Sequence, residues 1–129
     1  MIAAERLTIG YAETVILENL DFTVAEGDVF AILGGSGSGK STLLRNLIGL
    51  DEPLDGRVLV DGASPAQELG PPRFGVLFQS GALFGSMTLA ENVALPMRKW
   101  TGLDAAAIDI VVRAKLRLVG LEGFENHLP

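Results

Sequence analysis

Apolar and polar residues alternate with a period of two along the first part of the chain, which predicts antiparallel β-strands with one face in water. A first strand is expected over residues 5–9, a second where Leu20, Phe22 and Val24 alternate with polar neighbours, and a third over residues 57–60. Residues 51–56, directly before the third strand, carry the Asp, Pro and Gly of a turn. Two continuous apolar runs, residues 29–33 and 74–78, are expected to be buried strands.

Helical spacing of apolar residues appears elsewhere in the chain. Residues 43–48 predict a helix that begins near Gly39 and is capped by Gly49, and a short helix is expected from Ser64 to Gly70. In the last third, a brief helix over residues 89–95 is expected to stop at Pro96.

A longer helix is expected after Asp104, which is a suitable N-cap residue, and it should end at Gly120. Its apolar residues form one stripe, which is most simply a packing face: Ile108, Val111, Val112, Leu116 and Val119.

A glycine-rich loop, GGSGSGKST at residues 34–42, lies between the first apolar run and the first helix. It satisfies G-x-x-x-x-G-K-[ST], the phosphate-binding P-loop, in the strand, loop and helix context that this motif requires. Glycines let backbone N–H groups approach an anion closely, and the helix N-terminus adds unpaired donors and a positive dipole. A flexible glycine-serine linker is the alternative, and the flanking apolar elements disfavour it.

Each polar residue of the loop has an expected role with ATP and Mg²⁺. Lys40 supplies positive charge to the outer phosphates, Ser41 presents its hydroxyl to Mg²⁺, and Thr42 reaches an inner phosphate. The expected nucleotide-binding residues of the loop are Gly35, Ser36, Gly37, Ser38, Gly39, Lys40, Ser41 and Thr42.

Composition narrows the possible partners. The 129 residues are 48% hydrophobic and 20% charged, as in an ordinary soluble domain, and the net charge of −6 with scattered Lys and Arg argues against a nucleic-acid partner. No cysteine is present, which excludes disulfides and thiol chemistry. We expect no secretory signal and no membrane-spanning helix, and we assign no role to the only histidine, His127.

With Tyr11, the P-loop and Gln79 following one another in this order along the chain, the sequence resembles the ATP-binding subunit of ABC transporters. The resemblance implies an α/β fold of the P-loop NTPase class, an ABC ATPase-like core with an antiparallel β subdomain whose C-terminal part is absent. Residues 1–96 would be the N-terminal part of this domain, and residues 97–129 the start of its helical subdomain. It also implies that Tyr11 stacks on adenine and that Gln79 approaches Mg²⁺ and the attacking water, which makes Lys40 and Gln79 the catalytic residues and Ser41 and Gln79 the metal-binding ones.

Residues 77–84 and 87–96 are similar to ATPases of bacterial lipid-transport systems that work with a permease and a lipid-binding protein of the mammalian-cell-entry type. This implies a cytoplasmic subunit on the inner face of the cell membrane, held by a permease that docks between Ser80 and Leu95, and a head-to-tail dimer with a second ATPase subunit. For Leu83, Phe84 and Met87, a docking surface and a buried core are equally good interpretations.

The chain ends before the family's Leu-Ser-Gly-Gly signature, catalytic glutamate and switch histidine. We therefore expect the intact protein to hydrolyse ATP and power transport, and this chain alone to hydrolyse nothing. A nucleotide-binding module without hydrolysis is an alternative, whereas a small kinase or GTPase is disfavoured because no apolar run ending in Asp follows the P-loop helix. Unpaired sheet edges predict self-association or a partly ordered monomer.

Overall fold

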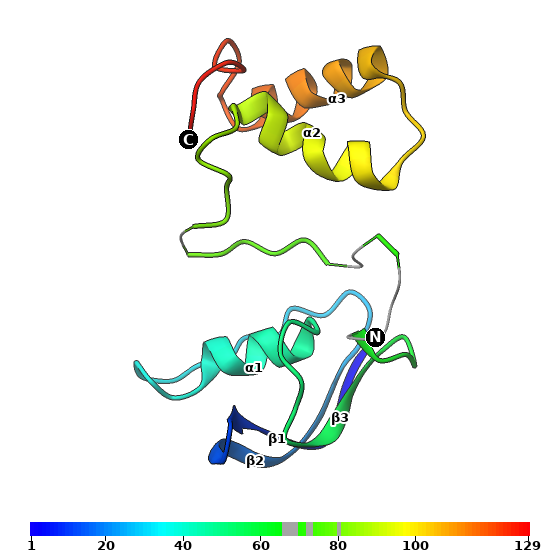
Figure 1. The fold of residues 1–129 in the computed structure, drawn as a ribbon. Coiled ribbons are helices and arrows are strands. Elements are labelled where there is room, and N and C mark those ends of the chain that lie inside the picture. The colour runs from blue at the N-terminus through cyan, green and yellow to red at the C-terminus, as the bar shows by residue number, and fades with distance from the viewer. Residues whose placement is uncertain (66–69, 72–73, 80) are drawn as a thin grey trace. The chain divides into compact units, whose positions relative to one another are not determined.

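The structure, a computed structural model, describes residues 1–65, 70, 71, 74–79 and 81–129. The chain forms two compact units, Met1–Leu69 and Gly70–Pro129, and each has its own apolar core. Figure 1 labels the elements β1 (Ile2–Tyr11), β2 (Thr14–Val24), α1 (Lys40–Leu47), β3 (Asp55–Val60), α2 (Leu89–Trp100) and α3 (Ala105–Leu118). No helix among these described residues is long and apolar enough to cross a bilayer.

The first unit is built on a three-stranded antiparallel sheet in the order β2-β1-β3. The three expected strands are present, and each is longer than the alternating pattern indicated. Ala4 and Leu7 both face the core although they are three residues apart, because a register shift between them restores the inward direction of the side chains. Among the described residues no further strand pairs with β2 or β3, and self-association through these edges remains a prediction.

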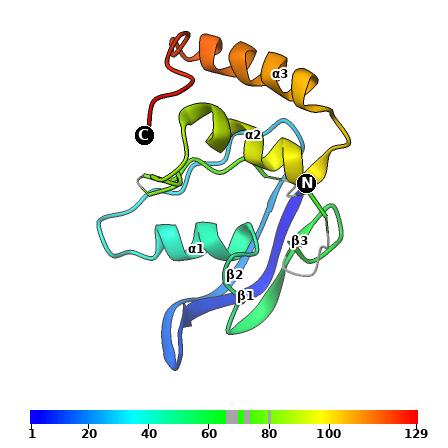
Figure 2. The ribbon, with the colours of Figure 1, turned by 45° about the horizontal axis from the view of Figure 1, so that its top comes forward.

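The helix α1 covers one face of this sheet, as both ribbon views show (Figures 1 and 2). Leu43 and Leu47 of α1 are buried against Leu7 and Ile9 of β1, the central strand, and these two strand residues are fully buried. Burying side chains of this size stabilises the fold by about 1.5–3 kcal/mol each. The core therefore fixes the first turn of α1 relative to the end of β1.

The C-terminal end of α1 is held by the turn that follows it. Gly49 has φ +74°, the left-handed conformation expected of a C-terminal cap, and Leu50 N–H donates to the carbonyl oxygen of Arg45 at 2.8 Å. The Arg45 guanidinium also pairs with both carboxylate oxygens of Asp51, at 2.9 and 3.2 Å. This bidentate pair raises the pKa of Arg45 above its usual value.

The two continuous apolar runs do not form the buried strands that their composition predicted. Val29 is 97% exposed, and Phe30 is half exposed and stacks on Phe22 of β2 at 5.1 Å between ring centres. In the second run Leu77 is 97% exposed. A buried strand needs hydrogen-bonding neighbours and cover on both faces, and neither run pairs with a strand in the described part of the chain. This prediction was therefore wrong for this chain.

The second unit packs α2 against α3. Its core consists of Ala94, Ile108, Val112 and Leu116, flanked by Leu89, Val93, Met97 and Leu121. Asp104 is the N-cap of α3 as expected, and its carboxylate accepts a hydrogen bond from Ala107 N–H at 2.8 Å. Gly120, with φ +76°, follows the helix end, while Val119 is 69% exposed because α3 ends one residue earlier and does not bring it to the packing face.

The expected stop at Pro96 was wrong, because α2 continues to Trp100. Proline lacks one N–H donor, so it removes a single helical hydrogen bond. Met97, the next residue, packs onto the core shared with α3, and this contact offsets the lost bond. The predicted subdomain boundary after residue 96 falls within this helix and remains a prediction for the intact domain. The short helix expected from Ser64 to Gly70 lies largely outside the described residues.

A capping box starts α2 and makes its stability depend on pH. The Glu91 carboxylate accepts a hydrogen bond from Thr88 N–H at 2.8 Å, and Glu91 N–H donates to the Thr88 hydroxyl at 3.2 Å. The backbone bond from Thr88, followed by its side-chain bond, lowers the pKa of Glu91 below its usual value. A lowered folded-state pKa means that this stabilisation is present above the unfolded-state pKa and is lost as the pH falls through the folded-state value.

We therefore expect the melting temperature of the chain to fall less steeply on acidification in Glu91→Gln than in the wild type. Thermal unfolding followed by circular dichroism between about pH 2.5 and 7 measures this difference, since that range brackets the carboxyl titration. Glu26→Gln, in an exposed turn of the first unit, is the matched control and should keep the wild-type slope. Parallel curves for Glu91→Gln and the wild type would contradict the prediction.

Candidate phosphate-binding site

The glycine loop adopts a backbone that requires glycine at two positions. Gly37 has φ +79° and Gly39 has φ +90°, both in the left-handed region that side chains disfavour. Gly39 is also the N-cap of α1, and a Cβ atom there would lie 2.6 Å from the Cγ2 atom of Ile16 on β2. Because the loop passes this close to the sheet, glycine at position 39 allows α1 to begin directly after the loop.

Lys40, the first residue of α1, folds its side chain back over the loop. Its Nζ donates to the carbonyl oxygens of Gly34 at 2.8 Å and Gly35 at 2.5 Å, and lies 3.3 Å from the Ser38 hydroxyl. These bonds occupy carbonyl oxygens that would repel an anion and place a positive charge over the loop. Lys40 is therefore both a structural tie of the loop and its main source of positive charge.

The loop forms one side of an open cavity of about 260 Å³. Tyr11, at the end of β1, and Ile16, on β2, line it together with residues 37–42. Tyr11 is 55% exposed, and Ser41 is exposed on the first turn of α1. The structure thus brings together Tyr11 and most of the residues predicted from the P-loop motif; Gly35 and Ser36 lie in the exposed outer part of the loop.

The residues of this cavity fit the phosphates of a nucleotide. Gly37 and Gly39 leave room where side chains would intrude, the N-terminal N–H groups of α1 are free of helical partners, and Lys40 carries the charge. Ser41 offers a hydroxyl suited to Mg²⁺, which would supply charge neutralisation of the phosphates when bound.

Gln79 is exposed and belongs to the second unit, whereas the cavity is formed by residues of the first. Its predicted role near Mg²⁺ therefore remains a prediction.

Sequence reasoning missed the residues that support the site from behind. Asn46 is 2% exposed, and its Nδ2 donates to the carbonyl oxygen of Thr42 at 2.9 Å. Its Oδ1 has no partner among the described residues. Ile16, which contacts the loop, was also missed. The only available signal for Asn46 was its spacing of four residues from Thr42, which puts both on one helix face.

A second region of interest is the segment before α2, where Asn92 holds the backbone of an exposed aromatic residue. The Asn92 Oδ1 accepts a hydrogen bond from Phe84 N–H at 2.8 Å. Its Nδ2 lies 3.1 Å from the Phe84 carbonyl oxygen and 3.0 Å from those of Met87 and Thr88. Leu83 and Phe84 are 56% and 59% exposed and Met87 is half-buried, so none of the three belongs to the buried core, and a docking role for them remains a prediction.

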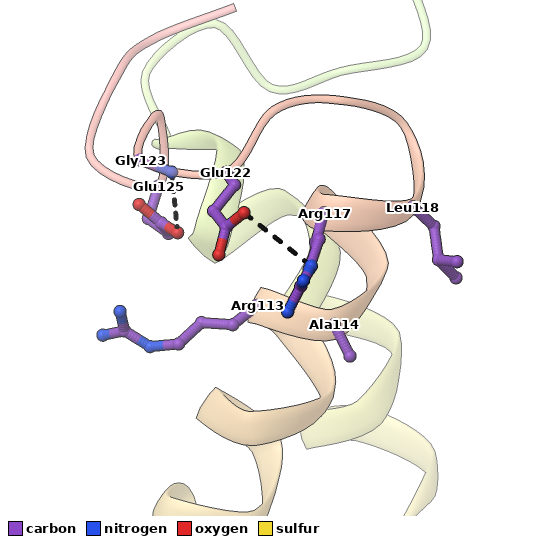
Figure 3. Close-up of a pocket in the computed structure, with 7 residues that line it drawn as sticks. All are labelled: Arg113, Ala114, Arg117, Leu118, Glu122, Gly123 and Glu125. Atoms are coloured by element: carbon purple, nitrogen blue, oxygen red, sulfur yellow. Dashed lines mark hydrogen bonds and ion pairs between the residues drawn. The ribbon is translucent and has the colours of Figure 1, made fainter.

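A larger cavity of about 910 Å³ lies beside the C-terminal half of α3 (Figure 3). It is lined by Arg113, Ala114, Arg117, Leu118, Glu122, Gly123 and Glu125. Arg113 pairs with Asp109 at 2.8 Å, and Arg117 lies 3.8 Å from Glu122. These are exposed ion pairs of balanced charge, which contribute little energy and select no particular ligand.

The chain is similar to known ATP-binding proteins. The family model described as ABC transporter matches residues 17–129. The probable ribonucleotide transport ATP-binding protein mkl of Mycobacterium tuberculosis (strain ATCC 25618 / H37Rv) is 44% identical over 129 residues, which are 95% of this chain and 36% of that protein. The intermembrane phospholipid transport system ATP-binding protein MlaF of Escherichia coli (strain K12) is 42% identical over 120 residues, which are 88% of this chain and 45% of that protein.

A solved structure shows the same similarity in three dimensions. The dimeric bacterial ABC transporter cassette MJ0796 superposes with a TM-score of 0.86 at 29% identity, over 100% of this chain and 62% of that one. By contrast, the chain spans less than half the length of mkl and of MlaF. Because the family model extends over most of the chain and includes the glycine loop, Lys40 and α1, this protein belongs to the ABC transporter family of ATP-binding proteins.

Proposed function

We propose that the intact protein binds ATP with Mg²⁺, hydrolyses it and thereby drives a transmembrane permease. The observation that carries this proposal is the single cavity in which Tyr11, the glycine loop and the first turn of α1 meet. MJ0796, which shares this fold, has been solved in a dimeric post-hydrolysis state bound to ADP and Pi. Dimerisation of the intact protein with a second ATPase subunit forms part of the proposal.

In this proposal, different residues bind the adenine base, the phosphates and Mg²⁺. The ring of Tyr11 offers a stacking surface to adenine, which contributes about 1–3 kcal/mol. The backbone N–H groups of the loop and the ammonium group of Lys40 bind the phosphates. Ser41 contributes a ligand to Mg²⁺, and Gln79 approaches the same ion and the attacking water in the assembled domain.

Titration of the 129-residue chain with a fluorescent ADP analogue, with and without Mg²⁺, tests nucleotide binding directly. We expect saturable binding in the micromolar range, which corresponds to about 8 kcal/mol, and displacement by unlabelled ATP. Release of phosphate from ATP by the chain alone should not exceed the background of the buffer. A folded chain that binds no nucleotide would sink the proposal; steady ATP turnover would contradict only the predicted inactivity of this chain.

We propose that the transporter moves phospholipid and that it works with a lipid-binding protein of the mammalian-cell-entry type. The resemblance of residues 77–96 to lipid-transport ATPases supports this choice, and the name of MlaF agrees with it. The names of other relatives, for ribonucleotide transport and for methionine import, supply the competing cargo classes. Reconstituting the intact ATPase with its permease in vesicles distinguishes them, since only the true cargo should be moved in an ATP-dependent way.

We propose that the permease docks on the segment that precedes and begins α2, on the inner face of the membrane. Phe84 supports this proposal, because its ring is exposed although its backbone N–H and C=O both lie within hydrogen-bonding distance of Asn92. An aromatic side chain held in place before binding loses little conformational entropy when a partner covers it. Ser80, at the start of the proposed docking segment, lies outside the described residues.

Replacing Asn92 by alanine is expected to release this segment. The variant removes the side-chain partner of the Phe84 N–H and of the Met87 carbonyl group, whereas the carbonyl groups of Phe84 and Thr88 keep the bonds from the backbone N–H groups of residues 87 and 92. We expect this to lower the stability of the second unit by about 1–3 kcal/mol. Amide hydrogen exchange measured by mass spectrometry should be faster over residues 84–88 and unchanged in β1. Asn126→Ala, which replaces an exposed asparagine near the end of the chain, is the matched control. Equal exchange rates in the two variants would show that the Asn92 side chain does not hold the backbone of Phe84.

A further inference from the structure

The hydroxyl groups of Tyr11 and Thr42 are hydrogen-bonded to each other across the candidate phosphate-binding site. Their oxygens lie 3.0 Å apart, although the two residues are 31 positions apart in the chain. Both residues line the cavity of about 260 Å³. A residue that serves only as a stacking surface needs a ring and no hydroxyl, so this bond calls for a separate explanation.

Both partners are held in place by elements other than the hydrogen bond itself. Tyr11 ends β1 and pairs with Thr14 of β2 across the hairpin, so the sheet sets its position. Thr42 is 5% exposed on the first turn of α1, and its carbonyl oxygen accepts the hydrogen bond from Asn46. The contact is therefore built into the first unit before any ligand binds.

The direction of this hydrogen bond decides what Thr42 offers to a ligand. Each hydroxyl has one proton to donate and can accept two bonds. If Thr42 donates to Tyr11, an oxygen lone pair of Thr42 is left for the cavity, and it repels an anion. If Tyr11 donates to Thr42, the Thr42 proton is free to be donated to a phosphate oxygen.

We propose that the Tyr11 hydroxyl orients the Thr42 hydroxyl as a hydrogen-bond donor toward a phosphate group, in addition to the stacking role of the Tyr11 ring. Tyr11 is then a positioning residue for polyphosphate recognition, and its side chain links the base and the phosphate chain of one nucleotide. This inference rests on the proposed nucleotide binding and concerns the same cavity.

A double-mutant cycle in the 129-residue chain separates this role from stacking. Tyr11→Phe keeps the ring and removes the Tyr11 hydroxyl. Thr42→Val keeps the shape of the side chain and removes the Thr42 hydroxyl. The two ligands are ADP and inorganic tripolyphosphate, which has no base to stack, and calorimetry measures both affinities. We expect Tyr11→Phe to weaken both ligands by about three- to tenfold, the range of one neutral hydrogen bond.

The cycle also predicts how the variants combine. In the Thr42→Val background, Tyr11→Phe should have no further effect on either ligand, because the hydroxyl it orients is gone. Thr42→Ser keeps that hydroxyl, and Tyr11→Phe should again weaken binding in this background. Circular dichroism of each variant shows whether the chain is still folded.

Three results would overturn the inference: unchanged tripolyphosphate affinity in Tyr11→Phe, losses that multiply in the double variant, or no effect of Tyr11→Phe in the Thr42→Ser background. Absence of ADP binding by the folded wild type is a distinct outcome, because it rejects the proposed function and this inference with it.

Discussion

Lys40→Ala is expected to weaken ADP binding by about a hundredfold or more. Hydrogen bonds to charged groups contribute about 1.5–3 kcal/mol each, and 1.4 kcal/mol corresponds to a factor of ten in affinity. The substitution removes the positive charge over the phosphates, and it also removes the bonds from Nζ to the carbonyl oxygens of Gly34 and Gly35. The loop loses its tie and exposes two carbonyl dipoles to the anion, so both effects act in the same direction.

Fluorescence titration with the ADP analogue measures this loss. Lys115→Ala removes the same charge from the exposed surface of α3 and should leave the affinity within about twofold of the wild type, because surface charges are screened in water. A loss of similar size in both variants would show that net charge, rather than the position of Lys40, controls binding. Retention of wild-type affinity in Lys40→Ala would contradict the placement of the phosphates over the loop.

The second large effect is expected on folding, from Gly56→Ala. Gly56 has φ +74°, and a Cβ atom there would lie 2.2 Å from the backbone oxygen of Arg6 and 2.5 Å from that of Glu5. The strands β1 and β3 approach closely at this point, where their register shifts, and the approaching atoms are backbone atoms that cannot rotate away. We expect a loss of at least about 3 kcal/mol in the free energy of unfolding, combining backbone strain with the steric clash.

Gly62→Ala is the matched control for this prediction. Gly62 has φ +84°, but a Cβ atom there would meet nothing within 4 Å, so only the backbone strain of about 1–2 kcal/mol applies. Urea denaturation followed by circular dichroism gives both values. Equal losses in the two variants would mean that β1 and β3 can separate without cost, contrary to the paired register.

The features that the sequence predicted correctly are those whose causes lie within a few residues. The start of α1 follows from glycine, lysine and apolar residues that are adjacent in the chain. Asp104 caps α3 through an N–H group three residues later, and Gly49 ends α1 through a conformation of its own backbone. Such interactions need no knowledge of the rest of the fold, because the chain itself brings the partners together.

Errors arose where the outcome depended on distant partners. The apolar runs at residues 29–33 and 74–78 have the composition of buried strands, but a strand forms only where another backbone offers its hydrogen bonds. Pro96 has the local properties of a helix stop, but packing of Met97 onto the core shared with α3 outweighs one lost hydrogen bond. In both cases tertiary contacts, or their absence, decided against local preference.

The sequence by itself therefore determined the glycine-rich loop with its P-loop motif, the helix that follows it and the antiparallel character of the first strands, since motif, periodicity and caps are local. Only the structure showed three hydrogen bonds: between the hydroxyl groups of Tyr11 and Thr42, from the Asn46 side chain to the Thr42 carbonyl oxygen, and from Phe84 N–H to the Asn92 side chain. The bond between Tyr11 and Thr42 spans 31 residues, and no local pattern encodes it. It exists because burial of Leu43 and Leu47 against β1 fixes one end of the helix beside one end of the strand.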